Sequence, residues 1–185
     1  MGAIQQSSAV YLSIMDGKIV RRFQSPTAQT KERVTKEGKL VHEEIYKGWT
    51  GRITNVKTRE SDYGKDWQVY LQDEDGTAIL SMRYSSGYAS AFLKALPNVD
   101  LSREVTITPH IKIEGDKKRT GIFLNQDGKS VKWFYTKETP NGLPPLEQIK
   151  VKGVATWDDS KMMEFLEQRT AELFNNTSDF EDAPF

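Results

Sequence analysis

The fold is decided by residues 48–84, which read GWTGRITNVKTRESDYGKDWQVYLQDEDGTAILSMRY. Turn-forming residues divide this stretch into three β-prone runs. In the middle run the side chains alternate, so that Trp67 shares a face with aliphatic residues while Tyr70 lies among glutamines. Two glycines near the start of the first run, Gly48 and Gly51, are typical of a strand that bends or bulges. The stretch therefore predicts three consecutive strands, at residues 49–56, 67–72 and 77–84.

A helix and two further strands are expected next. Apolar residues recur at helical spacing between a serine cap, at Ser85 or Ser86, and a stop at Pro97. Alternation then predicts strands at 105–113 and 121–125. Three strands, a helix and two strands, with glycines in the first strand, is the order of the OB-fold, a five-stranded barrel. A β-sandwich with appended helices is the alternative architecture.

The flanking segments predict appendages to this mainly β core. Asp16-Gly17 between two β-prone runs indicates a hairpin of strands 10–14 and 18–23. The other expectations are a mobile connection at 24–37, a strand at 39–46, a basic loop at 57–65, a basic hairpin tip at 117–119, an aromatic-rich strand at 130–136, an edge strand at 149–154 and a final helix capped by Asp158. The expected parts are an N-terminal extension with the β-hairpin (1–46), the OB-fold core (47–157), a C-terminal helix (158–174) and a disordered acidic tail (175–185).

The composition excludes several kinds of active site. There is no cysteine, so disulfides, cysteine–zinc sites and thiol nucleophiles are excluded. The two histidines, His42 and His110, lie too far apart in sequence to indicate a metal site or a catalytic triad. The carboxylates of residues 73–75 fall in an expected turn, and the chain has neither a Walker-type phosphate loop nor a G-x-G-x-x-G run. We therefore expect no catalysis, no metal and no cofactor.

The sequence shows no targeting to a membrane. It has neither a signal-peptide layout nor an apolar run long enough to cross a bilayer. Gln6 stands where a myristoylation signal requires serine or threonine. We therefore expect a soluble protein of the cytoplasm, that of the bacterial host if the chain is phage-encoded, with no membrane partner.

Charge is divided unevenly, although the formal net charge is zero. Residues 158–185 contain eight acids and two bases, a net of −6. Residues 1–157 contain 24 bases and 18 acids, a net of +6. A basic body with an acidic end is typical of proteins that contact nucleic acid or mask their own binding surface.

Cationic and aromatic side chains are interleaved in the central block, as binding of single-stranded nucleic acid requires. Cations neutralise the phosphates, and flat side chains stack on the bases. Tyr70 is expected on the face opposite the core and Arg83 is expected to project outward, whereas Trp67 and Trp133 are expected in the core. The candidate binding residues are Trp49, Arg52, Lys57, Arg59, Tyr63, Lys65, Tyr70, Arg83, Lys112, Lys132 and Phe134.

The last seven residues, DFEDAPF, are acidic and close on an aromatic residue that carries the terminal carboxylate. Their pattern resembles the C-terminal tip of bacterial and phage single-stranded DNA-binding (SSB) proteins. Ala183 stands where the bacterial family usually has isoleucine. The expected partner-binding residues of this tail are Asp179, Phe180, Glu181, Asp182, Pro184 and Phe185.

The resemblance implies a non-catalytic protein that coats and protects single-stranded DNA during phage or bacterial replication, recombination or repair. It also implies that the tail recruits replication and recombination proteins, and that it competes with DNA for the basic groove. A homo-oligomer is compatible with this interpretation. Two alternatives stay open: an RNA-binding OB module, because the sequence gives no information on recognition of the 2′-hydroxyl, and a protein-interaction adaptor that binds no nucleic acid.

Overall fold

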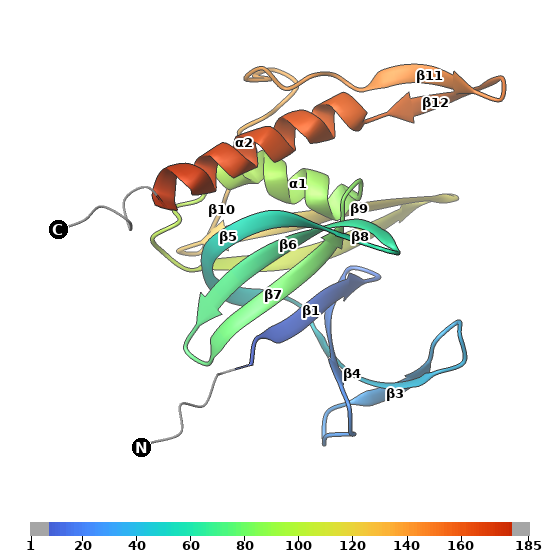
Figure 1. Ribbon diagram of the computed structural model, residues 1–185, viewed down its shortest axis with the longest axis vertical. Coiled ribbons are helices and arrows are strands. Elements are labelled where there is room, and N and C mark those ends of the chain that lie inside the picture. Colours follow the sequence, from blue (N-terminus) through green and yellow to red (C-terminus); the bar gives the residue numbers. More distant parts are fainter. Residues whose placement is uncertain (1–7, 179–185) are drawn as a thin grey trace.

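The computed structural model describes residues 8–178, with side chains described up to Asn175. The chain is mainly β and carries a C-terminal helix, as the sequence predicts (Figure 1). Its elements are β1 (Val10–Met15), β2 (Lys18–Phe23), β3 (Lys31–Val34), β4 (Leu40–Tyr46), β5 (Trp49–Ser61), β6 (Gly64–Asp73), β7 (Gly76–Arg83), α1 (Gly87–Ala95), the 3-10 helix η1 (Leu96–Asn98), β8 (Val105–Glu114), β9 (Lys117–Gln126), β10 (Lys129–Ser130), β11 (Glu147–Val151), β12 (Val154–Asp158) and α2 (Ser160–Ser178).

Ten of the strands form one hydrogen-bonded sheet, in the order β10-β9-β8-β5-β6-β7-β1-β2-β4-β3. Strand β5 makes this sheet coil, because residues 49–51 pair with β8 whereas the residues from Arg52 onward pair with β6. An irregularity between Ile53 and Asn55 adds to the bend. A Cβ on Gly51 would lie 3.2 Å from the carbonyl oxygen of Gln72, so glycine permits the close approach of β5 and β6 where the sheet turns.

The expected closed barrel of five strands is wrong. The elements β5 to β9 do follow the expected order, but the sheet has ten strands and is not closed by hydrogen bonds. The physical reason is β1, which pairs in parallel with β7 through Val10↔Ala78 and Leu12↔Leu80. It covers the edge of β7 that closure would use, and β2, β4 and β3 continue the sheet from there. Leu12 and Ile19 belong to the main core, so the N-terminal hairpin is built into the sheet.

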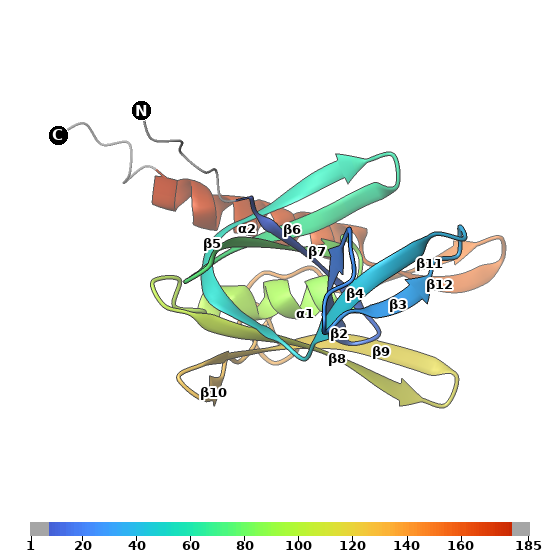
Figure 2. The same ribbon diagram turned by 90° about the horizontal axis from the view of Figure 1, so that it is seen from below.

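The turn of the β1–β2 hairpin packs against β8, on the side where the sheet is not closed by hydrogen bonds (Figure 2). Gly17 has a φ of +73°, and a Cβ there would lie 2.9 Å from the backbone nitrogen of Ile111. The N–H of Gly17 donates to the hydroxyl of Tyr88 at 2.9 Å. The Asp16-Gly17 hairpin is thus confirmed. Glycine is needed in it both for the left-handed backbone and for the contact with β8.

Helix α1 packs against β9 and β7, and α2 lies over α1 (Figure 1). The expected cap is confirmed at Ser86, whose side chain accepts the backbone N–H of Ala89. Phe92 of α1 and Met163 of α2 are fully buried in the core, and Trp67 is buried there as expected. None of the described helices is long and apolar enough to cross a membrane.

The final helix begins near the expected cap. An Asp158 carboxylate oxygen accepts the N–H of Ser160, the first helical residue, at 3.1 Å. The helix continues to Ser178, so the first four residues of the expected disordered tail, 175–178, are helical. Residues 179–185, which carry the proposed partner-binding residues, lie outside the described residues.

Three polar segments are more regular than their composition predicts. Residues 57–65, expected as a loop, complete the long β5–β6 hairpin, which turns only at Asp62-Tyr63. Residues 24–37, expected as a mobile connection, contain β3, which pairs with β4. Residues 149–154, expected as one edge strand, form the tip of the β11–β12 hairpin, with the end of β11, the turn and the first residue of β12. In the first two segments a paired neighbour strand compensates for weak intrinsic β-propensity.

The expected strand at 130–136 is wrong beyond its first residue, because the backbone there bonds to the end of α1. The N–H of Phe134 donates to the carbonyl of Lys94 at 2.7 Å. The side-chain amide of Asn98 donates to the carbonyl of Lys132 at 3.0 Å. The N–H of Val131 still donates to the carbonyl of Leu124 on β9 at 2.7 Å, and from Lys132 onward the bonds to Lys94 and Asn98 replace the ladder that a strand would make.

The same change of path overturns the expected burial of Trp133. Its side chain is 46% exposed, and the ammonium of Lys94 lies 4.9 Å from its ring centroid. Tyr135 takes the buried position instead, edge-on to Phe165 of α2. Alternation was the wrong guide here because residues 131–136 are not extended as a strand.

We predict that Gly17→Ala destabilises the protein more than Gly128→Ala does. Both glycines have a φ of +73°, so both substitutions impose the same backbone strain. A Cβ at Gly128 meets nothing within 4 Å, whereas one at Gly17 overlaps the backbone of β8. We expect an additional loss of about 1–3 kcal/mol in the free energy of unfolding for Gly17→Ala, measured by urea denaturation. Equal losses for the two variants would show that the turn does not pack against β8.

Candidate nucleic-acid interface

The outward side chains of β5, β6, β7 and β1 form one continuous surface, which we call the outer face. Alternation places them opposite the buried residues of the same strands. Strand pairing sets their order: Tyr70 lies opposite Ile79 on β7, and Ile79 lies opposite Tyr11 on β1. The outer face comprises Tyr11, Ser13, Asn55, Lys57, Arg59, Asp66, Gln68, Tyr70, Ile79, Ser81 and Arg83.

Two tyrosines with an isoleucine between them cross the middle of the outer face. Tyr11 is 65% exposed and Tyr70 is partly exposed, whereas Ile79 is only 6% exposed. The isoleucine therefore forms a floor between two aromatic side chains that project from neighbouring strands. Because adjacent strands lie about 4.8 Å apart, the two tyrosines stand on strands roughly 10 Å apart. The two rings are therefore separate aromatic platforms on this surface.

Cations border this aromatic row along β5. The ammonium of Lys57 lies 5.0 Å from the ring centroid of Tyr70. Lys57 and Arg59 are both exposed, and among the described side chains no carboxylate lies within 4.0 Å of either. An exposed cation without an internal carboxylate partner is free to neutralise a phosphate.

The outer face ends at the β5–β6 turn. Arg83 donates to the carbonyl of Tyr63 at 2.9 Å and lies 3.5 Å from the carboxylate of Asp66. Arg83 therefore projects outward, as the sequence predicts, but shares its charge with an acid. The Tyr63 side chain is 87% exposed at the tip of the turn. This end of the face offers an aromatic ring and a partly compensated guanidinium.

The outer face continues across β2 and β4, where an ion-pair cluster around the buried Glu43 supports it. Val20 lies opposite Ser13 and next to Ile45 on β4. Two residues further along each strand, Arg22 lies opposite Glu43. The Glu43 side chain is 5% exposed and accepts hydrogen bonds from Arg22 at 3.0 Å and from Arg33 at 2.8 and 3.1 Å.

The hydrogen bonds from Arg33, followed by those from Arg22, hold the pKa of Glu43 below its ordinary value, although burial opposes this shift. One carboxylate between two guanidiniums leaves a net positive charge on this part of the surface. The main effect of the cluster is therefore to stabilise the fold, and its net positive charge adds to that of the surface.

Five of the eleven candidate residues from the sequence come together on or beside the outer face, and six lie elsewhere. Tyr63 is at its tip, and the other four lie within it. The five are Lys57, Arg59, Tyr63, Tyr70 and Arg83, and the other six are Trp49, Arg52, Lys65, Lys112, Lys132 and Phe134.

Lys65 points to the opposite side of the sheet, where it ties β6 to α2. Its ammonium lies 2.9 Å from both carboxylate oxygens of Glu167. The same carboxylate accepts the hydroxyl of Tyr84 at 2.6 Å and that of Thr58 at 3.3 Å. Burial and the bond to Glu167 raise the pKa of Tyr84. Lys65 is therefore engaged in holding α2 on the sheet and is not presented to a ligand.

Trp49 and Arg52 lie on β5 before its bend. Trp49 is half-buried, with its ring edge-on to Tyr46 at a centroid distance of 5.4 Å, so it packs within the protein. Arg52 lines a hollow of about 540 Å³ together with Asp73, Arg103 and other charged residues. The charges in that hollow are mixed, which does not favour a polyanion.

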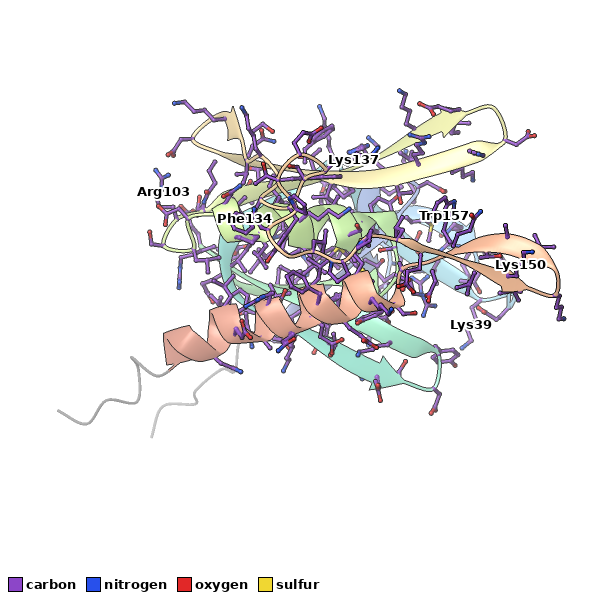
Figure 3. All side chains as sticks on the ribbon, turned by 90° about the horizontal axis from the view of Figure 1, so that it is seen from above. Lys39, Arg103, Phe134, Lys137, Lys150 and Trp157 are labelled. Carbon is purple, nitrogen blue, oxygen red and sulfur yellow. The ribbon has the colours of Figure 1, made fainter. Side chains whose placement is uncertain are left out.

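Lys112, Lys132 and Phe134 lie outside the outer face. Lys112 is on the β8–β9 hairpin, 2.9 Å from Glu114. The expected basic tip of this hairpin lies within β9, and the turn itself is at residues 115–116. Lys132 and Phe134 are exposed in the segment that bonds to α1, where Figure 3 shows Phe134 beside the helices. These residues have the cationic or aromatic character expected of a binding surface, but they do not lie on the outer face.

Tyr11 and Ile79 are not among the residues predicted from the sequence. The alternation of residues 10–14 does place Tyr11 opposite Leu12, so its exposure could be predicted. Its position beside Ile79 could not, because that depends on the parallel pairing of β1 with β7. A stacked pair on the β8–β9 hairpin was also missed: the rings of His110 and Phe123 lie 4.2 Å apart, and Phe123 is 54% exposed.

Comparison with known proteins gives no relative: no family model, curated protein or solved structure matches the chain. Membership of the SSB family therefore stays a prediction from sequence. Within the described part of the chain, no three histidine or acidic side chains are grouped so as to hold a metal ion.

We predict that Glu43 makes stability depend on pH. Because its pKa is lowered in the folded protein, its contribution is present above the ordinary glutamate pKa of about 4.3 and is lost as pH falls through the lowered value. Glu43→Gln should cost about 1–3 kcal/mol at neutral pH and should flatten the loss of stability in acid. Urea denaturation at a series of pH values measures both effects.

The exposed Glu37 in the β3–β4 turn provides the matched control, since Glu37→Gln should alter neither stability nor its pH dependence. A Glu43→Gln variant with the acid profile of the unmodified protein would contradict the assignment.

Proposed function

We propose that this chain binds single-stranded DNA without sequence specificity and protects it during phage or bacterial DNA replication, recombination or repair. The observation that carries the proposal is the outer face, where Tyr11 and Tyr70 flank Ile79 beside the uncompensated cations Lys57 and Arg59. The similarity of residues 179–185 to the SSB tip supports it independently from sequence.

The chemistry of the outer face suits a single strand better than a duplex. Stacking on an aromatic side chain is worth about 1–3 kcal/mol per base and requires a base face that a duplex does not offer. Ser81, between the tyrosines and the β5–β6 turn, supplies a hydroxyl that donates or accepts and so suits no particular base, whereas Gln68 beside it is 7% exposed and its side-chain oxygen accepts the hydroxyl of Tyr70 at 3.3 Å. Lys57 and Arg59 add phosphate contacts whose contribution falls with salt. This combination gives affinity with little sequence preference.

The proposal is tested by titrating the protein into labelled oligonucleotides and following fluorescence anisotropy. The dT strand should have about 25 nucleotides, more than the roughly 4–16 that one small β module covers. We expect tight binding of dT, weaker binding of a duplex of equal length, and a fall in affinity between about 50 mM and about 200 mM salt. Preferential binding of rU over dT would instead support an RNA-binding module. Absence of binding to all three would support the adaptor alternative and overturn the proposal.

Arg59→Glu tests the surface itself. Because Arg59 has no carboxylate partner among the described side chains, reversing its charge breaks no internal ion pair. We expect roughly tenfold weaker binding of dT at low salt and a salt dependence reduced by about 0.7 or more in logarithmic slope. Lys129→Glu, the same change of charge on β10 at the far edge of the sheet, is the control. Equal effects of the two variants would show that only net charge matters.

The acidic end forms the second part of the proposal. We propose that residues 179–185 compete with DNA for the cations of the outer face and recruit replication or recombination proteins. Removing these residues, which leaves α2 intact, should keep the affinity for dT equal or raise it, most clearly at low salt where charge repulsion and attraction are least screened. The anisotropy titration measures this, and a large loss of affinity on truncation would contradict the masking role.

A further inference from the structure

The β11–β12 hairpin stands apart from the rest of the fold. It forms a two-stranded sheet of its own and projects beyond the start of α2 (Figures 1 and 3). We call residues 146–158 the arm. Trp157 and Val154 are each 65% exposed, and Leu146 and Val151 are close to half exposed. A hairpin of two strands gains little stability alone. A cluster of exposed apolar side chains, such as the one on the arm, indicates a binding surface.

Strand register divides the arm into two different faces. On one face Trp157 lies opposite Gln148, and Lys150 lies opposite Ala155. Ala155 is small, so the indole of Trp157 and the stem of Lys150 are not separated by a bulky neighbour on that face. We call this the indole face. The other face carries the aliphatic residues Ile149, Val151 and Val154 with Thr156.

The arm is positively charged where it is exposed. Lys150 and Lys152 are the only charged residues between Gln148 and Trp157. The acids at its base are already engaged: the Glu147 carboxylate lies 2.7 Å from the ammonium of Lys161. The Asp158 carboxylate accepts the N–H and the hydroxyl of the first residue of α2. The indole face therefore combines an open aromatic ring with cations that lack a carboxylate partner among the described side chains.

We propose that the indole face of the arm is a second contact for single-stranded nucleic acid, in which a base stacks on Trp157 and phosphates lie against Lys150 and Lys152. This inference rests on the proposed function and extends it to a surface outside the main sheet. The arm also has a suitable position, because its tip projects to the same side of the molecule as the turns of the β5–β6 and β8–β9 hairpins in both views (Figures 1 and 2).

A second copy of the chain is the less favoured occupant. Stable protein interfaces bury about 800 Å² on each partner. The aliphatic face offers three medium-sized side chains that are 40–65% exposed, which is far too little area. The indole face carries positive charge, which opposes its pairing with an identical face of another copy. Charge and aromatic character together fit a polyanion with exposed bases.

The experiment compares Trp157→Ala and Trp157→Phe in the anisotropy titration with dT of about 25 nucleotides. Loss of one stacking platform should weaken binding about tenfold in Trp157→Ala. Trp157→Phe keeps a flat ring and should retain most of the affinity. Trp133→Ala is the matched control: that indole is 46% exposed and lies over Lys94 beside α1, away from the arm, and its loss should leave affinity unchanged. Circular dichroism should show equal folding, because Trp157 is mostly exposed.

Lys150→Glu provides a second reading that does not depend on stacking. It should lower the logarithmic slope of affinity against salt by about 0.7, the value for one phosphate contact on a single strand. Intrinsic fluorescence gives a third: Trp157→Phe should remove most of the quenching that dT causes in the unmodified protein.

The outcomes separate the inference from the function on which it rests. If dT binds but Trp157→Ala binds it as tightly as the unmodified protein, the arm is not a contact and the proposed function stands. If Trp157→Ala changes the molecular mass in light scattering while its affinity for dT is unaltered, the arm joins copies of the chain, and the inference is overturned. If the unmodified protein binds no oligonucleotide, the proposed function falls and takes the inference with it.

Discussion

The parallel pairing of β1 with β7 is the contact on which the rest of the structure depends. Without it, the apolar strand β7 would present an open edge, the usual starting point of aggregation. With it, Leu12 and Ile19 enter the main core and the Asp16-Gly17 turn reaches β8. The same pairing sets Tyr11 beside Ile79 and so completes the aromatic row of the outer face. An N-terminal segment that looks like an appendage is therefore needed for both the core and the candidate interface.

Carboxylates decide which cations of this basic body face solvent without a partner. Glu167 binds Lys65 and fixes α2 to the sheet. Glu43 binds Arg22 and Arg33 and so links the N-terminal strands β2, β3 and β4. In both cases an acid that is partly or fully buried keeps its charge because cations and hydrogen bonds surround it. The exposed cations without such a partner include Lys57 and Arg59 on the outer face and Lys150 and Lys152 on the arm. Net charge alone does not distinguish the cations that are bound by carboxylates and stabilise the fold from those that face solvent.

Much of the central fold could be predicted because its signals are local. The alternation of the middle strand, the serine cap of α1 and the Asp-Gly turns each depend on residues within a few positions of one another. The failures share a different origin. Residues 130–136 have the composition of a strand, yet beyond Val131 their backbone groups bond to Lys94 of α1 and Asn98 of η1. The barrel was expected to close with its own strands, yet a strand from more than 60 residues earlier pairs with β7 instead.

The candidate site divides in the same way. The sequence by itself determined the mainly β class and the separation of a basic body from an acidic end. It also determined that Trp67 is buried and that Tyr70 and Arg83 point outward. Only the tertiary structure decided which cations are compensated, that Trp49 packs against Tyr46, and that Tyr11 joins Tyr70 across Ile79. Composition and alternation fix the kind of surface a strand presents. Which strands become neighbours depends on pairings between distant segments, and these are selected by the free energy of the whole core.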